Sequence, residues 1–166
     1  DCKASQLGEY LPSLLDMEEN ENVVGIAVTT DYKGYILFCY ENGKMTKVEL
    51  KSYATKTNRK KLTKAYSSAS RLVKLIQLDD DTELVAISSI DKVLVFDTSQ
   101  ISVKATRDSQ GVSVMTLRKS AVLADVKRLE EVNIKDFKYY KTKNIPAAGC
   151  FLRDEDSKVV QTSIFV

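Results

Sequence analysis

The chain has 166 residues, of which 43 % are hydrophobic and 29 % are charged. This is the composition of an ordinary soluble protein and excludes an intrinsically disordered chain. It also excludes a membrane span, because no window approaches the roughly 18 unbroken apolar residues that such a helix needs, and no signal-peptide pattern opens the chain. The chain begins at Asp1 rather than Met, so we interpret it as a fragment of a longer protein.

The residue types that usually carry catalysis are scarce. The sequence has no histidine, and so lacks the commonest general base and the commonest metal ligand. Cys2, Cys39 and Cys150 are odd in number and far apart, which fits neither a disulfide framework nor a metal-binding knuckle, and we interpret them as free thiols. The acidic run Asp79–Asp81 is interpreted as a solvated turn. We therefore predict no catalytic residue, no metal site and no cofactor in this part of the protein.

The predicted elements, in chain order, are one short helix followed by many strands. Leu7–Leu15 have helical spacing, with Pro12 in the first turn. Beyond them the hydrophobic pattern repeats mostly every second residue and is rich in β-branched and aromatic residues, which indicates strands. The predicted strands are Val23–Thr30, Tyr35–Tyr40, Lys44–Leu50, Leu72–Leu78, Leu84–Ser88, Lys92–Phe96, Gly111–Leu117 and Ala121–Val126. Residues Ala124–Tyr140 fit either a helix or an irregular connection.

These short strands predict an all-β domain: a barrel, a sandwich or a propeller-like array. A repeat favours the array. Ile36–Tyr40 and Val93–Asp97 are similar strands, and each is followed by a turn, a polar connection and a strand that ends in Leu. Repeats of about 40–50 residues with four strands each are typical of blades. The predicted blades are 23–88, 89–126 and a further or partial blade at 127–166, about three in all.

The charge is unevenly distributed. The net charge is +2, yet the window Lys44–Lys74 holds ten basic residues and one acid, Glu49, while the rest of the chain is acidic overall. Such asymmetry indicates a polyanion-facing patch. The candidate phosphate-contacting residues are Lys44, Lys47, Lys51, Lys56, Arg59, Lys60, Lys61, Lys64, Arg71 and Lys74.

The centre of this window, Lys51–Lys64, lies between two predicted strands, so we expect an exposed loop, near which Tyr53 and Tyr66 stack or pack. A merely solvated loop is the alternative, but unmatched positive charge repels itself unless an anion is present. Phosphate contacts carry no sequence information, so we expect non-specific duplex binding that weakens steeply with salt.

A second basic segment contains Lys135, Lys138, Lys141 and Lys143 around two tyrosines, Tyr139 and Tyr140. We interpret it as a surface segment with packing tyrosines rather than as a second phosphate-binding patch.

Two stretches carry a resemblance to a known family. Gly43 followed by the basic strand Lys44–Leu50, and Arg107 followed by Gln110–Val112, resemble the repeat of the C-terminal domain of the DNA gyrase and topoisomerase IV A subunits. The resemblance covers about residues 23–126. It implies a β-pinwheel, a propeller-like array of four-stranded blades whose positively charged rim binds and bends double-stranded DNA. On this resemblance the ten cations above, joined by Arg107, are the DNA-binding residues.

The resemblance also implies a non-catalytic domain of a cytoplasmic bacterial enzyme, an ATP-dependent type II topoisomerase. The cleavage tyrosine, the Mg²⁺ site and the ATPase lie elsewhere, and the partners are the remainder of the A subunit and a B (ATPase) subunit. The glycine-rich box of gyrase proper is not found in this sequence, since the most similar stretch, Thr57–Leu62, has no glycine. A topoisomerase IV-like or divergent A subunit therefore fits better.

Two other classes remain open: a protein-interaction module whose basic loop docks an acidic partner, and a small enzyme. Changing Arg59, Lys60 and Lys61 to Glu separates the first class from DNA binding. If the loop contacts phosphates, this change weakens DNA binding evenly across sequences and leaves the fold intact.

Overall fold

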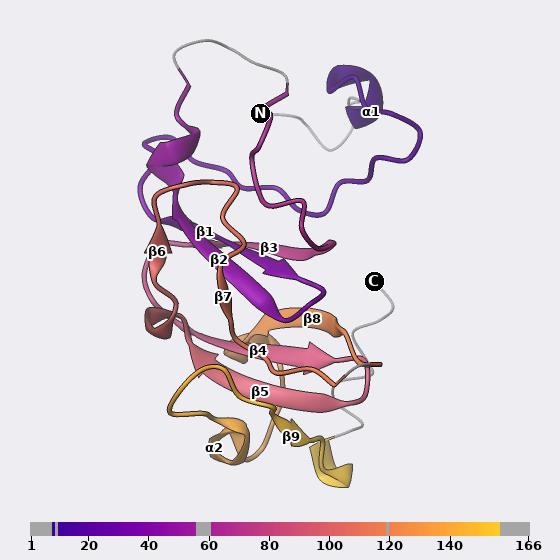
Figure 1. Ribbon diagram of the computed structural model, residues 1–166, viewed down its shortest axis with the longest axis vertical. Coiled ribbons are helices and arrows are strands. Elements are labelled where there is room, and N and C mark those ends of the chain that lie inside the picture. The colour runs from indigo at the N-terminus through magenta and orange to yellow at the C-terminus, as the bar shows by residue number, and fades with distance from the viewer. Residues whose placement is uncertain (1–7, 9, 56–60, 119, 157–166) are drawn as a thin grey trace.

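The computed structural model describes residues 8, 10–55, 61–118 and 120–156. They form two stacked β-sheets with little helix (Figure 1). The first sheet contains β1 (Tyr35–Tyr40), β2 (Lys44–Glu49), β3 (Leu72–Leu78), β6 (Val103–Lys104) and β7 (Val112–Ser113). The second contains β4 (Glu83–Ser88), β5 (Lys92–Asp97), β8 (Leu123–Arg128) and β9 (Cys150–Phe151). The helices are α1 (Leu11–Leu14), α2 (Phe137–Tyr140) and the 3-10 turns η1 (Leu50–Tyr53), η2 (Thr98–Gln100) and η3 (Leu129–Glu131). In this part of the chain no helix has the length and apolar character of a membrane span.

The two sheets are built on equivalent hairpins. In the first, Tyr35 of β1 pairs with Glu49 of β2, and in the second, Glu83 of β4 pairs with Asp97 of β5, so the register repeats with an offset of 48 residues. The predicted repeat was out of phase, because it aligned β1 with β5 instead of β4. The turn explains the error. Gly43 (φ +78°) in the first hairpin corresponds to Asp91 (φ +55°) in the second, and a positive φ is expected at a glycine in the sequence but not at an aspartate.

Each sheet is completed by segments that come later in the sequence and pair with one strand of its hairpin. β6 runs parallel to β2, and β7 pairs with β2 in the antiparallel sense. In the second sheet a single parallel bridge joins Val95 to Lys141, and β9 pairs with β5. We call 104–111 and 142–149 the first and second return turns. The sheets therefore interlock, and the change from the first to the second falls between β3 and β4 rather than after residue 88.

The hydrophobic core has three layers. Alternate side chains of β1, such as Leu37 and Cys39, face the layer between the two sheets, while Phe38 faces the outer side. β4 and β5 alternate in the same way between the central layer and an outer layer beside α2. Strands buried on both faces read as continuous apolar runs, which is why the sequence predicted them well. Burial of each large side chain contributes about 1.5–3 kcal/mol.

Polar contacts also join the two sheets. The Arg128 guanidinium at the end of β8 donates to the carbonyl oxygen of Gln77 in β3 at 2.7 Å. Lys74 of β3 lies 3.5 Å from Asp125 of β8. Together with the shared central layer, these contacts fix one sheet against the other, so loops at one end of the molecule keep a defined geometry.

The prediction of an all-β blade array is confirmed, and a short helix with Pro12 in its first turn is present. Three details were wrong. Val23–Thr30 is irregular, because its period-two pattern finds no backbone partner and most of its apolar side chains are exposed. Gly111–Leu117 contributes only the two-residue strand β7. The described residues form two sheets rather than about three blades, since 129–140 fold as η3 and α2.

Candidate nucleic-acid interface

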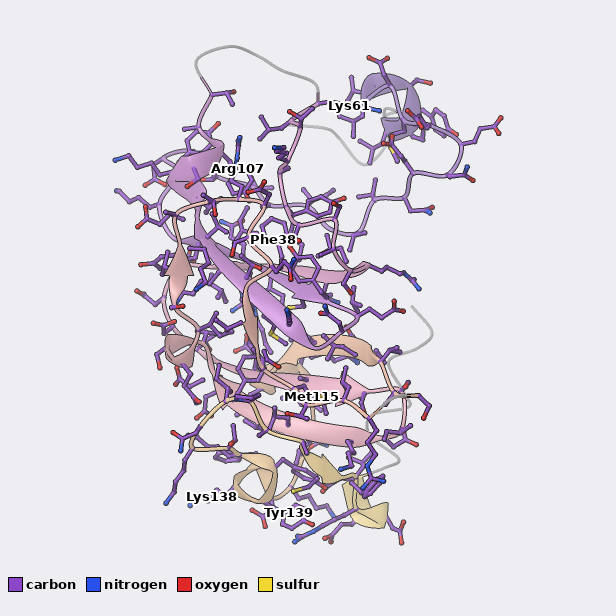
Figure 2. All side chains as sticks on the ribbon, viewed as in Figure 1. Phe38, Lys61, Arg107, Met115, Lys138 and Tyr139 are labelled. Atoms are coloured by element: carbon purple, nitrogen blue, oxygen red, sulfur yellow. The ribbon has the colours of Figure 1, made fainter. Side chains whose placement is uncertain are left out.

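Three segments meet at the outer end of the first sheet: η1, residues 61–71 and the first return turn. The Tyr53 hydroxyl donates to the carbonyl oxygen of Ala65 at 2.7 Å, which joins η1 to the loop. Arg107 in the return turn donates to the carbonyl oxygen of Ser52 at 3.4 Å, and its guanidinium lies 5.7 Å from the centre of the Tyr53 ring. Figure 2 places Arg107 and Lys61 at this same end of the molecule. We call these three segments the basic end.

A cluster of aromatic rings packs against the segments of the basic end. Phe38 stacks on Tyr66 with ring centres 5.7 Å apart, and Tyr53 lies 6.2 Å from Phe38. Burial raises the pKa of Tyr53, so this hydroxyl stays protonated and keeps donating its hydrogen bond at neutral pH. The expectation that Tyr53 and Tyr66 pack near the basic loop is confirmed.

The first return turn is set against β2 by a close backbone approach. Gly111 has φ +72°, and a Cβ at this position would lie 2.0 Å from the carbonyl oxygen of Met45. The Thr46 hydroxyl donates to the carbonyl oxygen of Ser109 at 2.9 Å. Only glycine combines this φ with this clearance, so the Gln-Gly-Val stretch fixes the place from which Arg107 projects.

The turn also connects Lys44 with the loop that carries Lys64. The Lys44 ammonium donates to the side-chain oxygen of Gln110 at 3.3 Å. Gln110 and Asp108 line a cavity of about 540 Å³ whose other wall is formed by Leu62 and residues 64–69. Lys64 therefore lines this depression, Lys44 contacts it through Gln110, and Arg107 lies beside it next to Asp108 in the chain.

Other predicted cations of this region are exposed. Lys51 and Lys64 are exposed. Arg71 lies 3.7 Å from Glu41 but keeps 79 % of its side chain in solvent. Lys61 forms an exposed ion pair of 3.1 Å with Glu21. Exposed pairs of this kind contribute little and are screened by salt, so these cations are free to exchange partners.

Lys47 is not one of the exposed cations, contrary to the prediction. Its side chain is only 3 % exposed, and its ammonium forms an ion pair with Asp81, lies 3.4 Å from the carbonyl oxygen of Thr98 and sits 4.6 Å from the centre of the Tyr35 ring. Lys47 therefore connects the first sheet to the chain that enters the second. Asp81 is correspondingly more than a solvated turn, and the Lys47 hydrogen bond holds its pKa below the usual value.

Lys74 is half-buried and paired with Asp125, as described above, so it contributes more to the joint between the sheets than to the basic end. Lys56, Arg59 and Lys60 lie outside the described residues.

The second basic segment lies at the opposite end of the molecule, where Figure 2 labels Lys138 and Tyr139. Tyr140 is buried, and its hydroxyl donates to Asp156 at 2.8 Å. The Arg153 guanidinium lies 3.6 Å from the centre of the Tyr139 ring, a contact that spacing alone did not reveal. Lys141 is paired with Glu83. The interpretation as a surface segment with packing tyrosines is supported by these contacts.

Comparisons with known proteins agree with this architecture. No protein-family model matches the chain, and a search of curated proteins finds no match. Among solved structures, the C-terminal domain of DNA topoisomerase IV is similar to 78 % of this chain, with 26 % identity and a TM-score of 0.67. The C-terminal domain of DNA gyrase A is similar to 75 %, with 16 % identity and a TM-score of 0.56. The ParC C-terminal domain of E. coli is similar to 91 %, with 13 % identity and a TM-score of 0.64.

The chain spans 41 % of the length of the first two structures and 68 % of the third. The two matches below 25 % identity establish a shared fold, and the topoisomerase IV match agrees with them. The chain therefore has the β-pinwheel fold of the C-terminal domains of topoisomerase IV and gyrase A subunits.

Proposed function

We propose that this chain binds double-stranded DNA without sequence specificity through its basic end, as a non-catalytic C-terminal domain of a type IIA topoisomerase A subunit. The observation that carries the proposal is the convergence of η1, residues 61–71 and the first return turn, in which Lys44 is bonded to Gln110, Arg107 to the Ser52 carbonyl, and Lys64 shares a depression with Gln110. The fold shared with topoisomerase C-terminal domains supports it.

The proposed contacts are electrostatic. Lysine and arginine neutralise phosphates and release condensed counterions, and this term depends little on base sequence. Arg107 is held by the Ser52 carbonyl and the Tyr53 ring, which leaves other guanidinium N–H groups to donate to a phosphate. Bending of the duplex, which the resemblance in the sequence implies, is part of the proposal.

The parent protein is proposed to be an ATP-dependent topoisomerase of the bacterial cytoplasm. Its ATP and Mg²⁺ sites, its cleavage tyrosine and its contacts with a B subunit belong to other parts of the assembly. The topoisomerase IV domain at 26 % identity, against 16 % for the gyrase A domain, favours a topoisomerase IV-like or divergent A subunit over gyrase proper.

The test compares two charge reversals of equal size. Lys51→Glu with Lys64→Glu alters the basic end, and Lys138→Glu with Lys143→Glu alters the opposite end; all four lysines are exposed, so the fold is expected to survive. Affinity for several unrelated duplexes is measured by fluorescence anisotropy, and bending by energy transfer between the ends of a labelled duplex.

We expect the first double variant to lose at least about tenfold in affinity on every duplex, since two phosphate contacts become two repulsions, while the second stays within about twofold. Equal losses in both variants would mean that only net charge matters, and the basic end would not be the interface. Tight binding to an acidic protein together with undetectable DNA binding would instead favour the interaction module.

A further inference from the structure

The segment between α1 and β1 lies across the outer face of the first sheet. We call residues 16–30 the strap (Figure 1). Its second half is anchored: the Gln77 side chain of β3 accepts from the Val28 N–H and donates to the Val28 carbonyl oxygen, both at 3.0 Å. Ala27 packs on the outer core layer, and Gly25 lies against Leu75. The Gln77 side chain thus makes two hydrogen bonds of the kind that the backbone of a neighbouring strand would otherwise make.

The first half of the strap is acidic and faces the basic loop. From Gly8 to Thr30 the sequence has five acidic residues and no basic one, while from Leu50 to Lys74 it has no acid. The Glu21 carboxylate accepts from the Glu18 N–H at 2.9 Å and from the Lys61 ammonium at 3.1 Å. These two hydrogen bonds, the Glu18 bond first, lower the pKa of Glu21, so the carboxylate stays charged at neutral pH.

The contact between the strap and the loop is loose. A cavity of about 550 Å³ separates them, lined on one side by strap residues such as Asn20 and Val23 and on the other by Lys61, Tyr66 and Leu72. Lys61 and Glu21 are each about half exposed. The acidic half can therefore leave the loop without disturbing the anchored half at Val28.

We propose that the acidic half of the strap, Asp16–Glu21, is an intramolecular competitor of DNA that occupies the loop cation Lys61 until a phosphate displaces it. The inference rests on the proposed function. The carboxylate of Glu21 takes the place that a phosphate oxygen would take on Lys61, and Glu18 and Glu19 add negative potential that repels an approaching duplex. Displacement also removes the like-charge repulsion between strap and duplex.

The test removes the strap's charge and keeps its shape. The variant Glu18→Gln, Glu19→Gln, Glu21→Gln is compared with a matched control, Asp79→Asn, Asp80→Asn, Glu130→Gln, which removes three exposed acids elsewhere. We expect the strap variant to bind duplex DNA about two- to fivefold more tightly than the control at low salt, and the difference to shrink as salt screens the strap.

A second readout follows the strap directly. The amide resonance of Glu18, whose N–H donates to Glu21, is expected to shift on addition of duplex to the wild-type protein toward its position in the Glu21→Gln variant. If the wild-type chain binds DNA but the strap variant equals its control, competition is refuted while the proposed function stands. If neither protein binds duplex at any salt concentration, the proposed function fails and the inference fails with it. Binding by the strap variant alone would support both.

Discussion

The β1–β2 and β4–β5 hairpins of this protein have the same strand pairing, and a later segment of the chain returns to each of them, yet they carry different charges at equivalent positions. Lys47 in the first hairpin corresponds to Val95 in the second, and Arg107 in the first return turn corresponds to Ile145 in the second. The glycine that closes each return turn is kept, with φ +72° at Gly111 and +68° at Gly149.

The comparison of the two hairpins distinguishes the features that form the scaffold from those that form the proposed interface. Backbone conformation and apolar alternation repeat, because both sheets must bury two faces and bring a distant segment back to the hairpin. Charge repeats less closely: the first return turn, which contains Lys104, Arg107 and Asp108, meets a long basic loop, whereas Lys143 is the single charged residue of the second return turn, 142–149. We therefore place the proposed DNA-binding activity in loops of the first sheet rather than in the repeat itself.

The largest expected effect concerns the shared glycine. Gly111→Ala puts a Cβ 2.0 Å from the Met45 carbonyl oxygen, and we expect a loss of about 3 kcal/mol or more in the free energy of unfolding. Gly149→Ala, with 2.8 Å to Val93, is expected to cost less, and Gly8→Ala, with no neighbour within 4 Å, close to nothing. Urea denaturation gives the three values, and a reversed order of the first two would break the comparison of the return turns.

The next effect concerns Lys47, where the hairpins differ. Asp81→Ala leaves the buried ammonium without its carboxylate, and we expect a loss of about 2 kcal/mol, between the values for exposed and buried pairs. Lys47→Val introduces the residue of the second hairpin and is expected to cost less. The double variant should be no less stable than Asp81→Ala alone, and additive losses in urea denaturation would contradict the pairing.

The same pair predicts a pH dependence. Because Lys47 lowers the pKa of Asp81 in the folded state, the pair's contribution is complete above about pH 4, near the unfolded value, and is lost as the pH falls through the folded value. Asp81→Asn should therefore flatten the acid limb of the stability curve. Parallel curves for the variant and the wild type would show that the carboxylate is not linked to folding.

A smaller effect is expected at the return turns themselves. Arg107→Ala removes one proposed phosphate contact and should weaken duplex binding by about fivefold. Ala148, the exposed counterpart of Gln110, offers the converse test, and Ala148→Lys should strengthen binding by no more than about twofold because it lies outside the basic end. A larger gain from Ala148→Lys than loss from Arg107→Ala would place the interface at the second sheet.

Much of the fold could be predicted from the sequence, and particular residues show why. Strands buried on both faces, such as β1, β4 and β5, are visible in the sequence as apolar runs, and Asn42-Gly43 marks the turn after β1. The phase of the repeat was missed because Asp91 adopts the conformation of Gly43 without being glycine. The return of β6 and β7 to the first sheet was also missed, since two-residue strands leave almost no local pattern.

The candidate site divides in the same way. The basic window predicted the exposed cations Lys51 and Lys64, because charge is visible in the sequence. Burial of Lys47 was invisible, since its partner Asp81 lies on a different segment and reaches it only after the sheets stack. The support of Arg107 by Tyr53 is likewise a product of tertiary contact.

The most direct test of the central claim, that cations of the basic end bind phosphates, is the salt dependence of duplex affinity. If four to six of these cations each meet a phosphate, log K falls with log salt at a slope of about −4 to −5, and changing both Lys51 and Lys64 to Ala reduces the magnitude of that slope by about 2. A slope near zero, or one that this double variant leaves unchanged, would contradict the account.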